Sequence, residues 1–285
     1  MNPRPPDRPW DPGAWLRERF RVIGVVHLLP LPGSAGHREP LEAIEERALE
    51  DARRLVEGGV DALIVENFGD APFAPHRVPD ETLAAFVRVA WTLRRTFPEV
   101  PLGINLLRNA ARQAVAVAAA VDARFVRINV PVGVFVAPSG WLVGQAREAA
   151  LLRKQLGAQG LGFFEDLLVK HAWPVGPEVP PEVWVRETEE RGLADALIVT
   201  GTRTGAPVDP EALERVLAVA RRPVLVGSGV TVEALPALVG RVQGVIVGTA
   251  FKVSGKTTEP VDFQRVQAFM RRVRALESQG TTGIS

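Results

Sequence analysis

The sequence predicts a single (β/α)8 barrel, a TIM barrel of the α/β class, behind a short proline-rich N-terminal arm. Short apolar segments alternate about eight times with helical segments, which is the pattern of a parallel sheet covered by helices. The 285 residues also suit one such barrel, which needs roughly 250 residues. An open, doubly wound sheet is the alternative. The Gly-x-Gly-x-x-Gly fingerprint of dinucleotide-binding sheets does not follow the first strand, which counts against that alternative.

The chain divides into an arm, a barrel and a tail. Residues 1–20 begin with MNPRPPDRPWDPG, whose prolines favour an irregular arm, and end in a short helix near 15–20. We expect this helix to close the barrel floor. Residues 21–276 hold every predicted strand and helix of the barrel. Residues 277–285 are mostly polar and are predicted to form a flexible tail.

Eight segments are predicted strands because they are short, rich in valine, isoleucine and leucine, and apolar enough to be buried on both faces, as parallel sheets require. In chain order they span 22–26, 62–65, 102–104, 125–128, 162–166, 196–199, 224–226 and 245–247. Nearly every one of them ends at glycine or at a polar residue.

Helical segments fill the intervals between the strands. The first, 41–58, repeats apolar residues at helical spacing and ends at Gly58 and Gly59. The others span 80–96, 110–120, 144–156, 180–191, a segment that begins at Asp209, and an apolar stripe over 263–276. A long stretch without helical spacing, 131–144, follows the fourth strand, and we expect a lid or an edge segment there.

Composition excludes several classes of function. The net charge is +1, from 34 basic and 33 acidic residues without a basic run, so no nucleic-acid partner is expected. The absence of cysteine removes disulfides, thiolate nucleophiles and sulfur-bound zinc. No apolar run approaches the roughly 20 residues of a membrane helix, and the N-terminus lacks a signal core, so a cytoplasmic protein is expected. A homo-oligomer is left open.

Two neighbouring strand exits predict a phosphate site. The strand at 224–226 runs into Gly227, Ser228 and Gly229, and the strand at 245–247 runs into Gly248 and Thr249. Glycine lets backbone N–H groups approach an anion, and the loops after the last two strands of a barrel are its usual phosphate site. The alternative is that these glycines only make tight turns.

Polar side chains stand at nearly every strand exit, and the exits of a parallel barrel share one end. The candidates for catalysis are His27, Glu66, Asp166, Lys170 and His171, and those for substrate binding are Asn67, Asn105, Arg108, Arg127, Asn129, Thr200 and Thr202, together with the glycine exits. Any one of them alone is more typical of a helix cap or a turn. Neighbours on a strand face opposite sides, so only one residue of Glu66–Asn67 and one of Glu165–Asp166 can enter the mouth.

Asp166, Lys170 and His171 bring a carboxylate, an amine and an imidazole into one strand exit and its loop. Asp166 ends an apolar strand, where burial raises the pKa of a carboxyl unless a cation lies beside it. Lys170 is the near cation in sequence, and only four of the 34 basic residues are lysines. We therefore expect Asp166 and Lys170 to transfer protons, assisted by His171 or His27, with a structural ion pair as the alternative. No cofactor is predicted; a divalent metal on Glu66, Asp166 and a histidine is a further alternative that no tight ligand spacing indicates.

Further segments carry a family signal: VIGVVHLLPLPGS at 22–34, GVDALIVENFGDAPF at 59–73, GINLLRN at 103–109, FVRINV at 125–130, EDLLVKHAWP at 165–174, ADALIVTGTRTGAP at 194–207, PVLVGSGVT at 223–231 and GVIVGTAFKVSGKTTEPVDFQRVQAFM at 244–270. They resemble the BtpA/SgcQ family of barrel proteins from Val22 to Met270. The chain departs from that pattern at Ala110 and Ala234, where Asp and Asn are usual. The resemblance implies a TIM barrel of the ribulose-phosphate-binding type, but it implies no secure catalytic residue.

Two function classes follow. The residues favour an enzyme that binds and acts on a phosphorylated small molecule, such as a sugar phosphate or a nucleotide. Taken with the resemblance, this implies an enzyme that processes sugar phosphates, nucleotides or nucleosides in a nucleosidase-, lyase- or isomerase-like reaction. The resemblance implies that class as well, because some members are described as enzymes of sugar-related operons. It equally implies the alternative, a non-catalytic factor for the biogenesis or stability of photosystem I or of membrane proteins.

Overall fold

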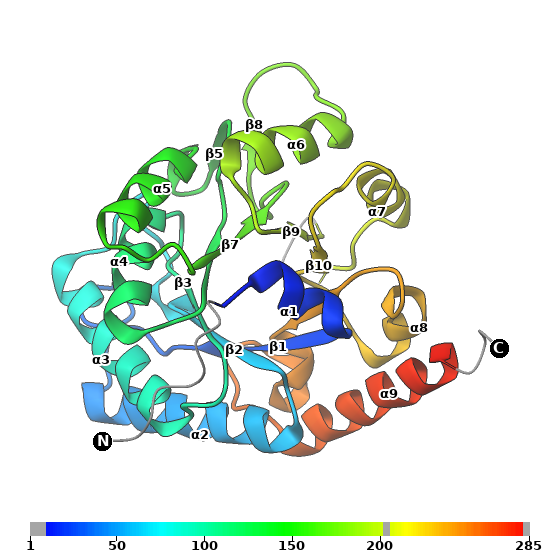
Figure 1. Ribbon diagram of the computed structural model, residues 1–285. Coiled ribbons are helices and arrows are strands. Elements are labelled where there is room, and N and C mark those ends of the chain that lie inside the picture. The colour runs from blue at the N-terminus through cyan, green and yellow to red at the C-terminus, as the bar shows by residue number, and fades with distance from the viewer. Residues whose placement is uncertain (1–9, 202–205, 282–285) are drawn as a thin grey trace.

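The computed structural model describes residues 10–201 and 206–281, and its core is a closed barrel of eight parallel strands (Figure 1). Around the barrel the strand order is β1-β11-β10-β9-β7-β4-β3-β2. The strands are β1 Arg21–His27, β2 Ala62–Glu66, β3 Leu102–Asn105, β4 Phe125–Ile128, β7 Gly162–Asp166, β9 Ala196–Val199, β10 Val224–Val226 and β11 Gly244–Val247. This closure confirms the predicted (β/α)8 fold, and each predicted strand matches an observed one to within one or two residues at either end.

Helices form a ring outside the strands (Figure 1). They are α2 Leu41–Gly58, α3 Asp80–Thr96, α4 Ala111–Val121, α5 Ala146–Gln155, α6 Pro181–Glu187, α7 Pro210–Leu217, α8 Leu235–Leu238 and α9 Phe263–Thr281. Short turns add η1 Phe68–Asp70, a π-helix η2 Thr188–Gly192, η3 Val232–Ala234, η4 Thr249–Phe251 and η5 Val253–Gly255. Across the described ranges, no helix combines the length and the apolar character needed to cross a membrane.

Two helix boundaries differ from those expected. The helix predicted over 180–191 is α6 followed by η2, whose wider turns end at Leu193 in the left-handed region. The last helix, α9, continues past Leu276 to Thr281, so the predicted tail 277–285 begins as helix. Propensity explains this extension, because glutamate and glutamine at 277 and 279 continue a helix readily.

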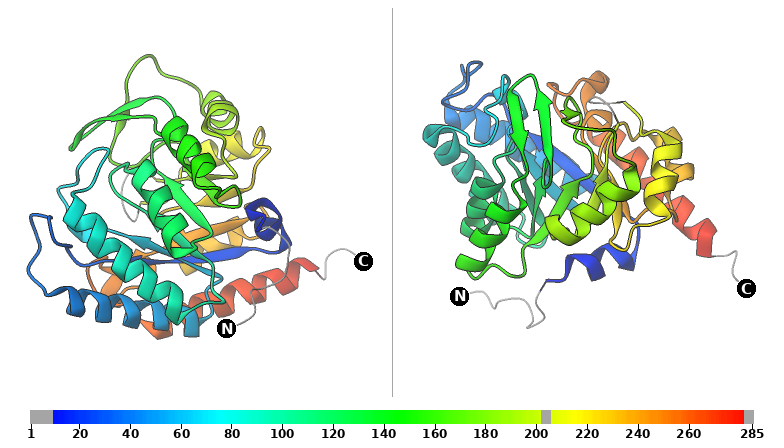
Figure 2. Two further views of the ribbon diagram at one scale, coloured as in Figure 1. Left: turned by 60° about the vertical axis from the view of Figure 1, so that its left-hand side comes forward. Right: turned by 90° about the horizontal axis from the view of Figure 1, so that it is seen from above.

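Helix α1, Pro12–Glu18, closes the end of the barrel where the strands begin. Asp11 caps its first turn by accepting a hydrogen bond from the backbone N–H of Ala14 at 3.0 Å. Its Leu16 is completely buried and packs into the barrel interior. The right-hand view of Figure 2 shows α1 at one end of the barrel and the tip of a green hairpin at the other.

The alternation of side chains along each strand decides what enters the barrel. The interior is filled by Ile23, Val25, Ile64, Phe125, Phe164, Ile198, Leu225 and Ile246. Two residues beyond Ile64, Phe125 and Phe164, the same parity places Glu66, Arg127 and Asp166 inside the barrel, near the carboxyl ends of β2, β4 and β7. Glu165, by contrast, faces the helix layer, where its carboxylate packs against Gly192 of η2.

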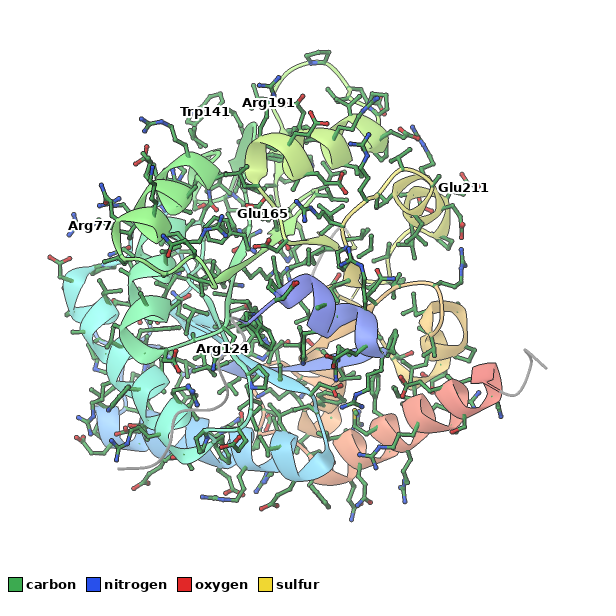
Figure 3. All side chains as sticks on the ribbon, in the orientation of Figure 1. Arg77, Arg124, Trp141, Glu165, Arg191 and Glu211 are labelled. Carbon is green, nitrogen blue, oxygen red and sulfur yellow. The ribbon has the colours of Figure 1, made fainter. Side chains whose placement is uncertain are left out.

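The expected lid or edge segment, 131–144, forms a hairpin. Strands β5 Val134–Ala137 and β6 Gly140–Val143 pair antiparallel, and β8 Trp173–Pro174 adds a third strand. Phe135 and Leu142 of this small sheet are buried, whereas the other face is exposed, with Trp141 at the outer edge of the molecule (Figure 3). Burial alternates along both short strands, but the residues VFVA and GWLV do not alternate between apolar and polar, so the sequence carries no period-two signal for them.

Candidate functional site

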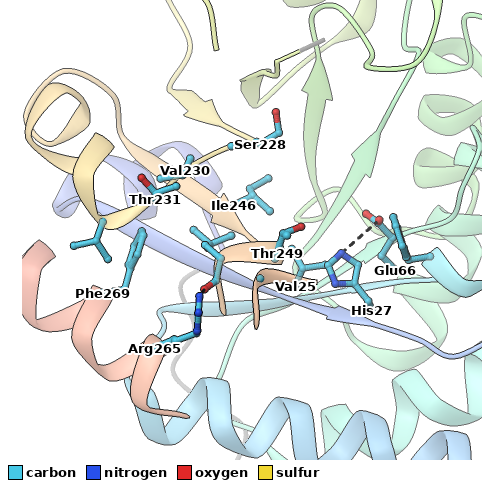
Figure 4. Close-up of a pocket in the computed structure, with 18 of the residues that line it drawn as sticks. Val25, His27, Glu66, Ser228, Val230, Thr231, Ile246, Thr249, Arg265 and Phe269 are labelled. Carbon is cyan, nitrogen blue, oxygen red and sulfur yellow. Dashed lines mark hydrogen bonds and ion pairs between the residues drawn. The ribbon is translucent and has the colours of Figure 1, made fainter. Parts of the chain in front are cut away.

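A cavity of about 430 Å³ opens at the carboxyl ends of the strands (Figure 4). We call it the main cavity. Its lining includes the two glycine exits, Gly227–Gly229 and Gly248–Ala250, together with His27, Glu66, Arg127 and Lys170, and the ring of His27 packs directly against Gly248. Its volume lies within the range of small-molecule sites, about 300–1,000 Å³. The predicted glycine loops and four of the predicted polar residues are therefore brought together.

The glycine exits are tightly packed from behind. Gly229 has a φ of +66°, and a Cβ there would overlap the carbonyl group of Ala206. A Cβ at Gly248 would overlap the ring of His27. Glycine is therefore needed at position 229 because the neighbouring loop leaves no room for a side chain. It is needed at position 248 because the ring of His27 occupies that space.

A buried ion pair lies beneath the main cavity. The Arg127 guanidinium donates from Nε to Asp166 Oδ1 at 2.9 Å and from Nη2 to Oδ2 at 3.0 Å. Asn129 Nδ2 donates to the same Oδ2 at 3.0 Å. Burial lowers the pKa of Arg127, but the Asp166 charge and its hydrogen bonds outweigh that effect and raise it. Within the described chain no hydrogen bond joins Asp166 to Lys170, so the cation beside this carboxylate is Arg127.

His27 and Glu66 form the second polar group of the mouth. Asn105 Nδ2 donates to Glu66 Oε2 at 2.7 Å, while His27 Nε2 lies 3.9 Å from Glu66 Oε1. Burial, and then the charges of Lys252 and Lys170, hold the pKa of His27 well below its usual range. The imidazole is therefore neutral at pH 7. Among the residues described, His27 Nδ1 and Asn105 Oδ1 are buried without a hydrogen-bond partner.

Lys170 stands between the main cavity and a smaller one of about 200 Å³, which we call the side cavity. Both cavities are lined by Glu66, Phe68, Arg127 and Lys170. Burial, and then the charge of Arg127, lower the pKa of Lys170, which makes proton release from its ammonium easier. Arg108 supports this loop by donating from Nη2 to the backbone carbonyl of Lys170.

Several other predicted site residues make hydrogen bonds that hold the loops after the strands in place. Asn67 faces away from the main cavity: its Nδ2 donates to Asp70 Oδ2 at 2.9 Å and its Oδ1 accepts from Leu107 N at 2.7 Å. Thr200 Oγ1 donates to the Leu168 carbonyl at 3.0 Å. Ser228 Oγ accepts from Gly201 N at 2.7 Å. Thr202 lies outside the described residues.

His171 and Thr249 lie at the edges of the site. His171 is mostly exposed, has a φ of +59° and contributes to the side cavity. Burial, and then the charge of Arg108, lower its pKa. Thr249 lines the main cavity, with its Oγ1 3.0 Å from Thr257 Oγ1.

Three cavity residues, Arg265, Phe68 and Phe73, were not among the site residues predicted from the sequence. Arg265, on the outer helix α9, lines the main cavity, with its Nη1 3.5 Å from the carbonyl oxygen of Ala250 (Figure 4). Phe68 and Phe73, from the loop after β2, wall the side cavity. A helix stripe and a proline-rich loop carry no mark that distinguishes these residues from ordinary surface positions.

Lys252, the other lysine that follows a strand, is structural. It is fully buried, and its Nζ donates to Asp51 Oδ2 on α2 at 2.7 Å. The metal site considered as an alternative would need several ligands close together. Within residues 10–201 and 206–281, no three His, Cys, Asp or Glu side chains lie close enough to hold a metal ion. Both oxygens of Asp166 instead accept hydrogen bonds from Arg127 and Asn129.

These features define the class: a (β/α)8 barrel protein with a ligand-sized site at the carboxyl ends of its strands. Residues 18–275 match the model of the BtpA family, and the chain belongs to that family. The photosystem I biogenesis protein BtpA of Synechocystis is 42% identical over 251 residues, which cover 87% of this chain and 86% of that protein. The resemblance seen in the sequence is thereby confirmed.

Solved structures share the barrel. N-(5'-phosphoribosyl)anthranilate isomerase from Pyrococcus furiosus superposes with a TM-score of 0.56 at 15% identity, covering 90% of this chain and 99% of that one. The 7,8-dihydropteroate synthase from Vibrio fischeri superposes with a TM-score of 0.58 at 15% identity, covering 95% of each chain. At such identities the likeness shows the fold alone.

Proposed function

We propose that this protein is an enzyme that binds a phosphorylated small molecule, a sugar phosphate or a nucleotide, in the main cavity and carries out acid–base chemistry on it. The observation that carries the proposal is the meeting of two glycine exits with several ionisable groups in the lining of one cavity of about 430 Å³. The Pyrococcus isomerase is named for a phosphoribosyl compound, which agrees with the proposal, but the support comes from the cavity itself.

The phosphate lies against Gly227–Gly229 and Gly248–Thr249 in this proposal. Two cations of the cavity wall, Lys170 and Arg265, would face it. Arg265 lies 3.9 Å from the carboxylate of Asp262 in an exposed pair, whereas the charge of Arg127 is balanced by the buried Asp166. A guanidinium suits phosphate oxygens because it presents several donors in one plane. A cytoplasmic location and a homo-oligomeric state stay predictions.

Proton transfer falls to Lys170 and His27, with Glu66 between them. Both basic groups line the main cavity, and both have pKa values lowered by burial, which brings lysine nearer to neutral pH and keeps histidine neutral. Asp166 lines neither cavity and holds Arg127 in position. Of the originally expected pair, Lys170 therefore keeps the catalytic role and Asp166 acts as a positioning residue.

Ribose 5-phosphate is the probe for this proposal. We expect it to raise the melting temperature of the protein, because a ligand at a hundred times its Kd adds about 2.7 kcal/mol of stability. Arg265→Met should weaken its binding by roughly tenfold, since a charge-assisted hydrogen bond contributes about 1.5–3 kcal/mol. Arg272→Met, an exposed arginine on the same helix but outside the cavity, is the matched control.

Turnover of the compound that binds provides the second readout. Lys170→Met and His27→Gln should each lower kcat by roughly 10²-fold or more, as expected for general acid–base groups. The proposal fails if neither inorganic phosphate nor ribose 5-phosphate binds. The proposed acid–base roles of Lys170 and His27 are wrong if both variants turn over the bound compound at the normal rate.

A specific observation favours a second candidate function, that of a non-catalytic biogenesis or stability factor. Val136, Trp141, Val143, Trp173 and Val175 are all at least 39% exposed. Strand register places Val136 opposite both Trp141 and Trp173, so these side chains share one face of the small sheet. A contiguous apolar surface of this kind marks sites of protein or membrane interaction.

Complementation separates the two candidates. In a Synechocystis strain that lacks its BtpA protein, the factor role predicts that this chain restores photosystem I levels and that the double variant Trp141→Ser, Trp173→Ser does not. The Lys170→Met variant, with the apolar face intact, should then restore them as well. Loss of complementation by Lys170→Met, with the double variant still active, would assign the role to the cavity instead.

A further inference from the structure

We propose that the side cavity is a subsite for the second part of a two-part ligand: a flat, uncharged heterocyclic ring with an N–H or O–H donor, attached to the phosphorylated sugar. The inference rests on the proposed function, because the phosphate must occupy the main cavity. It goes further by naming the substrate class as nucleoside 5'-monophosphates and compounds of that shape.

The two cavities adjoin, because Glu66, Phe68, Arg127 and Lys170 line both of them. One molecule can therefore occupy the two spaces at once. The side cavity, at about 200 Å³, is large enough for a ring, since an apolar cavity of about 150 Å³ in another protein binds benzene. The glycine exits belong to the main cavity alone, which fixes the orientation of the ligand.

Aromatic and aliphatic side chains wall the side cavity. Phe68 and Phe73 come from the loop after β2, and Leu107 comes from the exit of β3. Phe68 is held by an edge contact with His27, with ring centroids 4.9 Å apart. Arg108 adds a guanidinium plane, a group that stacks on aromatic faces. Such walls select a flat ring over an open-chain polar group.

Asn129 indicates that the ring carries a donor. Its Nδ2 donates to Asp166, which as a carboxylate accepts only, so the orientation of the amide is chemically determined. The remaining atom, Oδ1, has no partner in the described chain, although the residue is only 3% exposed and lines the side cavity. A buried acceptor left without a donor is unfavourable, and an N–H or O–H of the ligand would remove that cost.

The charges around the two cavities do not require a charged ring. Arg108, Arg127, Lys170 and Arg265 carry positive charge, and Glu66, Glu233 and Asp166 carry negative charge. The single positive charge that is left over faces the phosphate of the ligand. A neutral ring therefore meets no uncompensated charge.

Calorimetric titration of the full chain with ribose 5-phosphate, AMP and UMP tests the subsite. We expect AMP, UMP or both to bind at least tenfold more tightly than ribose 5-phosphate. Phe73→Ala should reduce this advantage to less than threefold and change the Kd of ribose 5-phosphate by less than twofold. Phe97→Ala removes a similarly half-buried phenylalanine at the end of α3, outside the side cavity, and should leave both affinities unchanged.

Ala71→Phe supplies a second variant, because Ala71 is exposed at the rim of the side cavity and a larger side chain there fills it. It should also remove the nucleotide advantage while ribose 5-phosphate still binds. If ribose 5-phosphate binds and neither nucleotide binds more tightly, the subsite is overturned and the proposed function stands. Nucleotide binding that neither variant affects overturns the subsite too, whereas loss of all phosphate binding overturns the proposed function itself.

Discussion

Arg127 determines what Asp166 can do in the mouth of the barrel. The guanidinium engages both carboxylate oxygens, and the two residues are only 4% and 1% exposed. Arginine does not lose its proton in proteins, so this charge cannot be removed by titration. A carboxylate held in this way orients its partner and is not available to exchange protons with a ligand in the cavity.

Asp166→Asn should therefore be a strongly destabilising substitution. It leaves Arg127 buried without a counter-charge, and breaking one side of a buried pair costs about 3–5 kcal/mol. Lys170→Met should change the free energy of unfolding by about 1 kcal/mol or less, because Lys170 is only half-buried and has no hydrogen bond to Asp166. Urea denaturation of the two variants measures both values. A loss below about 1 kcal/mol for Asp166→Asn would contradict a structural role for the pair and return this residue to the acid–base candidates.

At the scale of elements, the strands could be predicted from the sequence, but the side chains that pair between neighbouring strands could not. Each strand is an apolar run that can be recognised by itself, and parity correctly limited the mouth to one residue of each neighbouring pair. The Arg127–Asp166 pair depends on the register between β4 and β7, in which Arg127 lies opposite Phe164. No local pattern encodes that register, so Lys170, four residues along the chain, seemed the nearer cation.

The hairpin of β5 and β6 was missed for a different reason. Each strand has four residues, and the buried positions Phe135, Ala137 and Leu142 are separated by apolar residues that remain exposed. The usual contrast between apolar and polar positions is therefore absent. The same feature that concealed these strands creates the exposed apolar face on which the second candidate function depends.

At the scale of the whole molecule, the barrel places two buried groups with opposite effects on pH-dependent stability. Glu165 faces η2, and within the described chain neither carboxylate oxygen has a hydrogen-bond partner. Burial, and then the charge of Asp195, raise its pKa well above the usual range. Burial, and then Lys252, lower the pKa of His27. Folding thus favours the neutral form of both groups.

The signs of the two contributions follow from linkage. A raised carboxyl pKa means that the folded state binds more protons, so the stability from neutral Glu165 is complete below a pH of about 4.3 and is lost as pH rises toward the folded pKa. The lowered pKa of His27 means that the folded state binds fewer protons than the unfolded state. The stability from neutral His27 is therefore complete above a pH of about 6.5 and is lost as pH falls toward the folded pKa. A single group changes the free energy of unfolding by at most about 1.4 kcal/mol per pH unit.

Glu165→Gln should consequently stabilise the protein at neutral pH and have little effect near pH 4. The amide keeps the size and neutrality of the protonated acid, and it removes the cost of taking up a proton on folding above the unfolded pKa. The difference in unfolding free energy between this variant and the parent, measured by urea denaturation from pH 4 to pH 8, should grow as pH rises. His27→Gln provides the opposite control, since its difference from the parent should grow as pH falls below about 6.5. A difference for Glu165→Gln that stays constant over this range would mean that its carboxyl group reaches solvent or a cation in the folded barrel.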